Sequence, residues 1–355
     1  MNGYFINCDW GTTRFRLRLI DTATGDMLAR LRNDDGAAAL ALRAYGEDRA
    51  TLFRDTLQGH MQTLATRAEM DLSRIPIVIS GMASSSIGWR ELPYAKLPFA
   101  LDAKDAIWHN LNDTGKPGGV HAAGVFLFSG LRSDKDVLRG EETQVIGVAQ
   151  LPQVAPLMDD VLILLPGTHS KHVQVVDHRI TDFHTHMTGE LYHTLRHHGS
   201  LQHSTGSSAF QEDEPLLLTG PIRESFCEGL DESTKAPLSA NLFRVRSRQL
   251  LDDCEASSNS AFLSGLLIGS EVQSLRHQWP DEKPLVLCAG QRLCELYEIA
   301  LKTLCPKSSV TIIPPSDVSR LSALGQSVAF QHIFNTTAGG ADGPVIDGSV
   351  VDVPT

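Results

Sequence analysis

The stretch INCDWGTTRFRLRLID, residues 6–21, places an acid, a glycine and two threonines on one turn between two apolar runs. The run before the turn predicts a strand over residues 4–9. The run after it, residues 15–20, alternates apolar side chains with arginines, the period-two pattern of a half-buried strand. A plain hairpin needs neither an acid at its strand end nor paired hydroxyls, so the turn is expected to hold a ligand.

A second stretch, VLILLPGTHSKHVQVVDHRITDF at residues 161–183, repeats this arrangement about half a chain later. It predicts a strand, a Gly-Thr turn and a second strand. Gly11 and Gly167 each stand ten residues before an aspartate, Asp21 and Asp177 respectively. The shared spacing and the matching strand patterns predict an internal duplication.

The chain's 355 residues are enough for two domains, and the proline-containing stretch LPQVAPLMDD lies between the two copies. We therefore predict one domain over residues 1–152 and a second over residues 153–355. A helical stretch is expected over residues 45–70, and IPIVISGM at residues 75–82 is typical of a buried parallel strand. This alternation of strands and helices predicts an α/β architecture.

The composition excludes several functional classes. A net charge of −11 argues against general nucleic-acid binding, and no apolar run is long enough to span a bilayer. The first residues show no signal-peptide pattern, and the six cysteines form no C-x-x-C pair, which favours free thiols in the cytoplasm. His184 and His186 alternate along a predicted strand but have no clear third ligand, so we do not predict a histidine metal site. A small-molecule substrate is expected, and a homodimer is left open.

The chemistry of the first turn fits phosphate. Backbone amides at Gly11 can approach phosphate oxygens closely because glycine has no Cβ, and the hydroxyls of Thr12 and Thr13 add donors. Asp9 alone would repel phosphate, but it fits a carboxylate that holds Mg²⁺ through water. The alternative for a single turn is a capping aspartate with ordinary turn threonines. No G-x-x-x-x-G-K-[ST] motif is present, which excludes a P-loop.

Several motifs resemble those of the sugar kinase/actin/Hsp70 superfamily. DWGTTR at residues 9–14 resembles its first phosphate element, PGTHSK at residues 166–171 its second, and LCAGQRLCELY at residues 287–297 its adenosine element. SRLSALGQSVAF at residues 319–330 resembles its last helix. The resemblance implies an actin-like ATPase fold of two ribonuclease-H-like domains, with ATP and Mg²⁺ in an inter-domain cleft. The nucleotide-binding residues that it implies in the second half of the chain are Gly167, Thr168, Ser170, Lys171, Ala289 and Gly290.

The chain more specifically resembles the 2-dehydro-3-deoxygalactonokinases. The motifs that carry this resemblance, in family order, are DWGTTRFRL (9–17), GM (81–82) with GW.E.PY (88–94), RGEETQVIG (139–147), LPGTHSKHV (165–173), MTGELY (187–192) and FLSGLLIGSE (262–271). The resemblance implies a phosphotransferase with an alcohol acceptor, which uses ATP to phosphorylate the C6 hydroxyl of 2-dehydro-3-deoxy-D-galactonate in sugar-acid catabolism. Thr188 is expected at a strand-to-helix turn near the nucleotide, with a helix cap as the alternative.

One departure from the family pattern concerns the acceptor. The family commonly has Gly-Ser-Arg-Gln-Gly-Trp where this chain has Ser-Ser-Ser-Ile-Gly-Trp, so Ser86 and Ile87 replace an arginine and a glutamine. A guanidinium is the natural partner of a sugar-acid carboxylate, and Arg16 is the least favoured candidate because a solvated strand face explains it. Trp89 and Tyr94 could form walls of the sugar pocket, and ordinary packing explains them equally well. The candidate substrate-binding residues are Arg14, Ser86, Trp89, Arg90 and Tyr94.

The acid that would accept the hydroxyl proton lies in RGEETQVIG. Related kinases carry an acidic residue at the start of this helix, and Glu141 and Glu142 both fit. We favour Glu142 because an acid followed by threonine also occurs in related hexose kinases. The alternative is purely structural: the helix macrodipole favours acidic residues in the first turn, whatever their chemistry. Alternative functions are a kinase of another sugar or sugar acid, and a nucleotide-binding sugar sensor without transfer. Regulators of related fold carry a helix-turn-helix before the first phosphate element, which here begins at Asp9.

Overall fold

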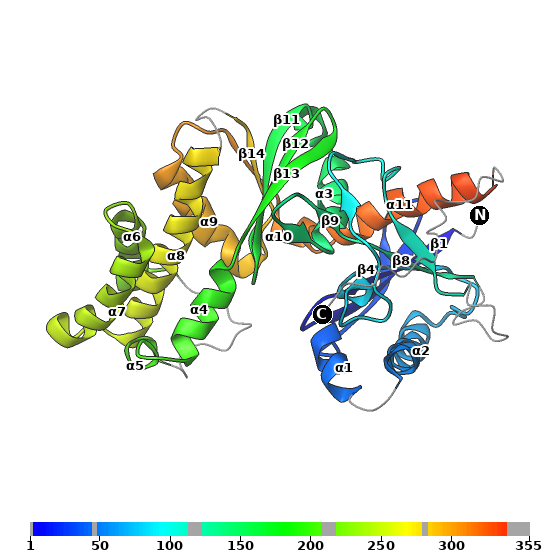
Figure 1. Cartoon of the computed structure of the whole chain (residues 1–355), viewed down its shortest axis with the longest axis horizontal. Coiled ribbons are helices and arrows are strands. Elements are labelled where there is room, and N and C mark those ends of the chain that lie inside the picture. The colour runs from blue at the N-terminus through cyan, green and yellow to red at the C-terminus, as the bar shows by residue number, and fades with distance from the viewer. Residues whose placement is uncertain (1–2, 45–47, 113–122, 207–217, 279–282, 339–355) are drawn as a thin grey trace, which may run out of the picture. The chain divides into compact units, whose positions relative to one another are not determined.

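The computed structural model describes residues 3–44, 48–112, 123–206, 218–278 and 283–338. The chain forms two compact units: the first combines Met1–Gln150 with Leu321–Thr355, and the second is Leu151–Arg320 (Figure 1). The sequence predicts a division after residue 152 and assigns everything beyond it to the second domain, whereas residues from Leu321 onward group with the first unit.

The first unit is built on a sheet with strand order β3-β2-β1-β4-β8-β7. β1, β4 and β8 run parallel to one another, while β2, β3 and β7 are antiparallel to their neighbours. The predicted strands at residues 4–9 and 15–20 are present with one more residue each. The strand bounds are β1 (Tyr4–Trp10), β2 (Phe15–Asp21), β3 (Met27–Asn33), β4 (Ile77–Gly81), β7 (Trp108–Asn110) and β8 (Val125–Phe128).

Helices cover both faces of this sheet because β1 is apolar on both sides. Its alternate residues Ile6, Cys8 and Trp10 join the core beneath α1 and α2, while Phe5 stacks on Phe330 of α11 at 5.7 Å (Figure 1). The helix bounds are α1 (Ala37–Arg43), α2 (Arg49–Ala68), α3 (Glu141–Ala149) and α11 (Leu321–Ala338). The shorter elements of this unit are the 3-10 helix η1 (Met82–Ser84) and strands β5 (Ala95–Lys96), β6 (Phe99–Ala100), β9 (Leu131–Arg132) and β10 (Val137–Leu138).

The second unit repeats the same sheet. Its strands have the order β15-β14-β11-β12-β13, with β11, β14 and β15 parallel and the β11-β12-β13 meander antiparallel. Both the order and the directions match those of β8-β4-β1-β2-β3, which confirms the internal duplication. The strand bounds are β11 (Asp160–Leu165), β12 (Ser170–Val176), β13 (Arg179–His186), β14 (Leu285–Leu287) and β15 (Val310–Ile312).

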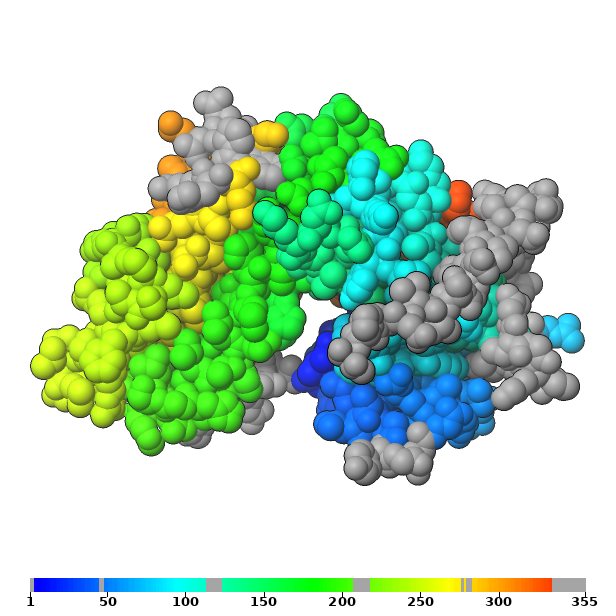
Figure 2. Space-filling model, viewed as in Figure 1, coloured from blue at the N-terminus to red at the C-terminus, as the bar shows by residue number. Residues whose placement is uncertain are grey.

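The second unit also carries a helical layer in which α8 is central. Phe226 of α6 and Leu296 of α9 share a buried cluster with α8 residues, and α4, α5 and α7 pack on α8 in a second cluster. α6 and α7 lie at the surface (yellow-green in Figure 2), where Phe243 is exposed. The helix bounds are η2 (Ala155–Leu157), α4 (Thr188–His197), α5 (Gln202–Thr205), α6 (Gly220–Ser233), α7 (Leu238–Asp252), α8 (Ala256–Gln278), α9 (Gln291–Leu304) and α10 (Pro315–Val318). Among the helices of the described ranges, none is both long and apolar enough to cross a membrane.

The helix α11 is fixed to the first unit by a polar side chain and by close backbone packing. Gln326 donates from Nε2 to the Cys8 carbonyl oxygen at 3.0 Å and to Ser80 Oγ at 2.8 Å, and its Oε1 accepts from Asn7 Nδ2 at 2.8 Å. Gly325 meets the backbone of α3 so closely that a Cβ would lie 1.7 Å from the Thr143 carbonyl oxygen. Both contacts assign α11 to the first unit.

We predict that Gly325→Ala destabilises the full chain. The added methyl group forces α11 away from α3, and overpacking of this kind typically costs about 1–3 kcal/mol. Thermal unfolding should show a midpoint below that of the wild type. The matched control is Gly59→Ala in α2, where no atom lies within 4 Å of the new Cβ and where alanine favours the helix. Equal midpoints for the two variants would contradict the prediction.

Candidate functional site

The turn of residues 11–14 in the first unit is exposed at its two threonines and held from behind by the start of α1. The amides of Ala37 and Ala38 donate to the carbonyls of Gly11 and Thr12 at 3.0 Å. Gly36 makes this contact possible, since a Cβ there would lie 2.3 Å from the Thr12 carbonyl oxygen. The carbonyls of Gly11 and Thr12 are therefore satisfied within the protein, and the threonine side chains remain exposed.

The charges around this turn are paired. Arg16, expected on a solvated strand face, lies opposite Asp9 in the β1–β2 pairing and donates from Nη1 to Asp9 Oδ2 at 2.8 Å. The Asp9 side chain is 18% exposed, so Arg16 offsets a partly buried negative charge. Arg14 forms an ion pair with Asp34, whose carboxylate is 79% exposed. Such exposed pairs contribute little, so a bound anion can compete with Asp34 for Arg14 at small cost.

The turn of residues 167–170 in the second unit is held in the same way. Thr168 is exposed, and its carbonyl accepts from the Glu190 amide in the first turn of α4 at 3.0 Å. Gly189 permits the approach, because a Cβ there would lie 2.4 Å from the Gly167 carbonyl oxygen. The Glu190 carboxylate also bonds His169 at 2.5 Å. The duplication thus extends from the sheets to the glycine-mediated support of each turn.

Two residues predicted to bind phosphate lie inside the second unit. Ser170 is fully buried, and its Oγ accepts from the Gly167 amide at 3.4 Å and contacts the Tyr297 hydroxyl at 3.1 Å. Lys171 is 5% exposed and donates from Nζ to Thr185 Oγ1 at 2.7 Å. β12 begins at Ser170, so the two side chains point to opposite faces of the sheet, and both faces are covered at this position. Thr168 and His169 are therefore the side chains of this turn that face solvent.

The predicted adenosine element is a strand-to-helix turn. Ala289 is fully buried behind β14, and Gly290 is exposed as the residue that precedes α9. No atom lies within 4 Å of a Cβ built on Gly290, and its φ of −65° is open to any residue. This glycine is therefore not required by the local backbone, and the space beside it is open.

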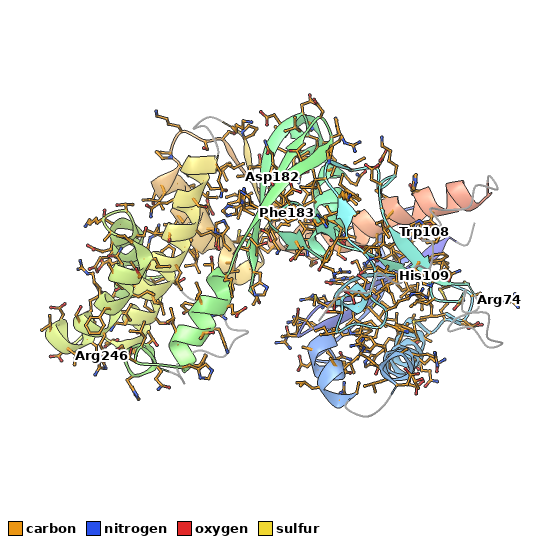
Figure 3. All side chains as sticks on the ribbon, viewed as in Figure 1. Arg74, Trp108, His109, Asp182, Phe183 and Arg246 are labelled. Atoms are coloured by element: carbon orange, nitrogen blue, oxygen red, sulfur yellow. The ribbon has the colours of Figure 1, made fainter. Side chains whose placement is uncertain are left out.

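The predicted substrate residues have different surroundings. Trp89 is 7% exposed and packs edge-on against Trp10 at 6.2 Å, so it belongs to the core. Ser86 is exposed in the loop after η1. Arg90 is exposed and bonds the Nε2 atom of His109 at 2.7 Å. His109, labelled in Figure 3, belongs to β7 at the edge of the sheet. Ser86 and Arg90 are thus accessible for binding, whereas Trp89 has the packing role.

Arg139 supports this region, although its motif alone gave it no role. Its Nη1 donates to the Ser84 carbonyl at 2.5 Å and to Ser84 Oγ at 2.6 Å, and its guanidinium lies 4.1 Å from the centre of the Tyr94 ring. Tyr94 is therefore half-buried beneath a cation rather than fully available to a substrate. Arg139 connects the loop of the family departure with the start of α3.

The two candidate acids at the start of α3 differ in environment. Glu141 is half-buried, whereas Glu142 is 3% exposed and lies against a small cavity that Phe99, Phe128 and Ile146 help to line. Glu142 Oε2 accepts from the Gly140 amide at 2.6 Å, and Oε1 has no hydrogen-bond partner in the described residues. Burial raises the pKa of Glu142 to about 8, and the neighbouring charge of Glu141 adds to the rise. Glu142 therefore holds its proton at neutral pH.

In the described ranges, no group of three or more His, Cys, Asp or Glu side chains is arranged to hold a metal ion. The rings of His172 and His186 lie in the second unit with their centres 4.4 Å apart and their planes tilted by 40°. A cation at the first turn would therefore have Asp9 as a single protein carboxylate, which fits Mg²⁺ that keeps most of its water and binds phosphate oxygens.

Two sheets of one topology, each with a Gly-Thr turn after its first strand, define the class of protein. The chain has the actin-like ATPase fold, made of two ribonuclease-H-like domains. Helices α4 to α8 lie between β13 and β14, and α11 returns to the first unit.

Comparison with known proteins identifies the family within this class. The family model of 2-keto-3-deoxy-galactonokinase matches residues 9–314, and the chain belongs to this family. It is 31% identical to the 2-dehydro-3-deoxygalactonokinase of Escherichia coli (strain K12) over 309 residues, which covers 86% of this chain and 91% of the relative. A relative of the same name from Rhizobium meliloti (strain 1021) is 31% identical over 85% of this chain and 90% of its own. A crystal structure from Sinorhizobium meliloti, named for the same kinase, has a TM-score of 0.73 at 30% identity and covers 93% of this chain and 99% of its own.

We predict that Glu142 makes the stability of the chain depend on pH. Between an ordinary glutamate pKa of 4.5 and the folded value of about 8, the folded chain holds a proton that the unfolded chain has released. The free energy of unfolding should therefore fall as the pH rises through this window, by up to about 1.4 kcal/mol per pH unit. Glu142→Gln removes the titrating group. From pH 5.5 to pH 8, the midpoint of thermal unfolding should therefore fall further in the wild type than in this variant. A constant difference between the two proteins would show that Glu142 is ionised throughout.

Proposed function

We propose that this chain uses ATP to phosphorylate the C6 hydroxyl of 2-dehydro-3-deoxy-D-galactonate in sugar-acid catabolism. The observation that carries the proposal is the match of residues 9–314 to the 2-keto-3-deoxy-galactonokinase family together with two intact Gly-Thr turns. The reaction is a phosphoryl transfer to an alcohol. The cytoplasm, where ATP is available, is the proposed compartment, and a homodimer is a proposed assembly.

The exposed turns supply the groups that a nucleotide phosphate requires. Thr12, Thr13 and Thr168 present hydroxyls at the surface, and no atom stands within 4 Å of the side-chain position of Gly167. Asp9 shares one carboxylate oxygen with Arg16, and its Oδ1 is the proposed acceptor for a water of Mg²⁺. When bound, Mg²⁺ neutralises charge on the phosphate oxygens. The open approach to Gly290 supports a role for the start of α9 on the adenosine side.

The raised pKa of Glu142 favours its neighbour Glu141 as the general base. A base must be ionised at the working pH, and burial keeps Glu142 protonated. Glu141 is half-buried, and its Oε2 accepts from the Arg139 amide at 3.0 Å, which orients the carboxylate. We therefore assign proton removal from the sugar hydroxyl to Glu141 and a supporting role to Glu142, in place of the preference for Glu142 that the motif alone suggested.

The acceptor carboxylate is assigned to exposed arginines. Arg14 is paired with a well-exposed aspartate, and Arg90 is exposed beside His109. Ser86 is exposed at the departure from the family pattern, so the loop after η1 contributes a hydroxyl rather than a cation. This difference favours a second candidate function, a kinase of another sugar acid that retains the carboxylate.

We expect the purified protein with Mg-ATP to phosphorylate 2-dehydro-3-deoxy-D-galactonate with the highest kcat/KM of an acceptor panel. The panel should include the gluconate epimer and neutral hexoses, and ADP release coupled to NADH oxidation measures the rate. A preference for the epimer would support the second candidate. The absence of transfer to every sugar acid, with ATP bound normally, would refute the kinase proposal and favour a nucleotide-binding sensor.

We predict that Glu141→Gln lowers kcat by at least about 100-fold while leaving the Kd of ADP within about twofold of the wild-type value. Glu142→Gln replaces a protonated carboxyl by a neutral group of the same shape, so its kcat at pH 7 should stay within a few-fold of the wild type. Steady-state kinetics and calorimetric titration of ADP provide the two readouts. The reverse pattern, an inactive Glu142→Gln beside an active Glu141→Gln, would transfer the role of base to Glu142.

A further inference from the structure

A buried carboxylate in the second unit connects three segments of the candidate nucleotide site. Glu271 of α8 is 3% exposed, and its Oε1 bonds His172 Nε2 on β12 at 3.0 Å. Its Oε2 accepts from the Tyr297 hydroxyl on α9 at 2.8 Å and from the Thr188 hydroxyl at the start of α4. We define these residues with Ser170, which contacts Tyr297, as the Glu271 cluster.

The carboxylate of Glu271 is ionised in spite of its burial. Burial acts to raise its pKa, but the hydrogen bonds and charge of His172 and the hydroxyls of Thr188 and Tyr297 outweigh it, and the net pKa lies below the ordinary glutamate value. An ionised carboxylate only accepts hydrogen bonds. His172 must therefore carry a proton on Nε2, and the Tyr297 proton must point at Glu271. Burial and the charge of Glu271 raise the pKa of Tyr297 well above its ordinary value, so that proton stays in place.

The direction of these bonds extends to the phosphate turn. Because Tyr297 gives its proton to Glu271, its oxygen is left to accept from the Ser170 hydroxyl at 3.1 Å. The Ser170 oxygen in turn accepts from the Gly167 amide at 3.4 Å. One chain of donors thus runs from the turn backbone to the carboxylate: Gly167, Ser170, Tyr297, Glu271. Each bond has a single permitted direction, which fixes the orientation of the buried hydroxyls.

Thr188 gives the cluster a second connection to the same turn. It is the first residue of α4, and its hydroxyl is directed to Glu271 rather than to a helix cap, since α4 has no side-chain cap at Met187. The next residue is Gly189, whose backbone packs against Gly167. Glu271 therefore holds the turn from within through Tyr297 and Ser170, and from the side through Thr188 and the start of α4.

We propose that Glu271 is a positioning residue for the nucleotide, which acts through Tyr297 and Thr188 to fix the Gly167–Thr168 turn without contact to the ligand. The inference rests on the proposed function, since that function assigns the nucleotide to this turn. Because the cluster belongs to the second unit alone, its loss weakens nucleotide binding and leaves the KM of the sugar acid unchanged. Removal of one donor to a buried, charged acceptor typically changes an equilibrium by about tenfold or more.

The test compares two Tyr→Phe variants of the full chain. Tyr297→Phe removes the hydroxyl that joins Ser170 to Glu271. Tyr192→Phe is the matched control, because its hydroxyl bonds Ser260 Oγ at 2.7 Å in the same unit and has no part in the cluster. Calorimetric titration with Mg-ADP should give a Kd about tenfold weaker for Tyr297→Phe and within about twofold of the wild type for Tyr192→Phe. Equal Kd values for the two variants would overturn the proposal.

A second pair of variants separates positioning from loss of folding. Thr188→Val keeps the side-chain shape and removes the donor to Glu271, whereas Thr188→Ser keeps the donor. Thr188→Val should raise the KM of ATP several-fold with an unchanged KM for the sugar acid, and Thr188→Ser should restore the wild-type KM. A loss in both variants, or a parallel rise in both KM values, would mark Thr188 as structural and overturn the assignment. If the Kd of ADP changes in the variants as proposed but the protein transfers phosphate to no sugar acid, the proposed function is refuted and the positioning role of Glu271 stands.

Discussion

The close contact between each Gly-Thr turn and the start of a helix is the constraint on which the rest of the site depends. In the first unit Gly36 brings the amides of α1 to the turn, and in the second Gly189 does the same for α4. A side chain at either glycine would occupy the space of a backbone carbonyl. Because those carbonyls are satisfied from behind, the threonine hydroxyls stay at the surface, where the turns can meet an anion.

Two buried glutamates show how the surroundings of a carboxyl decide its charge. Glu142 accepts a backbone hydrogen bond at one oxygen and has an apolar cavity nearby, so burial dominates and keeps it protonated. Glu271 is as deeply buried but receives three side-chain donors, so it is ionised. The number of donors, rather than the depth of burial, separates the two. The neutral Glu142 leaves Glu141 as the proposed base, and the charged Glu271 orders the hydroxyls around it.

The sequence predicts the local parts of this structure well because those parts depend on nearby residues. The strands around Gly11 and Gly167 follow from side-chain alternation, and the repeated spacing predicts the shared topology. Contacts over long distances are not encoded in such patterns. Lys171 lies in a phosphate-binding motif, yet it bonds Thr185 inside the unit. The small residues of α8 indicate close helix packing, but they do not reveal which side chains bond Glu271.

The same limit explains the remaining differences. Trp89 fits a sugar pocket by type, but Trp10 and Phe53 surround it in the core. Arg16 looks like a surface residue along its own strand, and only the register with β1 places it opposite Asp9. Arg139 stands in a recognised motif, although its role follows from contacts with Ser84 and Tyr94 far along the chain. The helix α11 shows the same dependence, because its place in the first unit rests on Gly325 and Gln326 meeting residues more than a hundred positions earlier.

The return of α11 to the first unit has a consequence for the order in which the protein matures on the ribosome. The second unit is one continuous segment, Leu151–Arg320, inserted in the chain of the first. The sheet around β1 emerges early, yet Asn7 and Phe5 lose their contact with water only when Gln326 and Phe330 arrive. Domains usually complete their folding in the order of synthesis. Here the unit that begins first is completed last, after the whole of the second has been made.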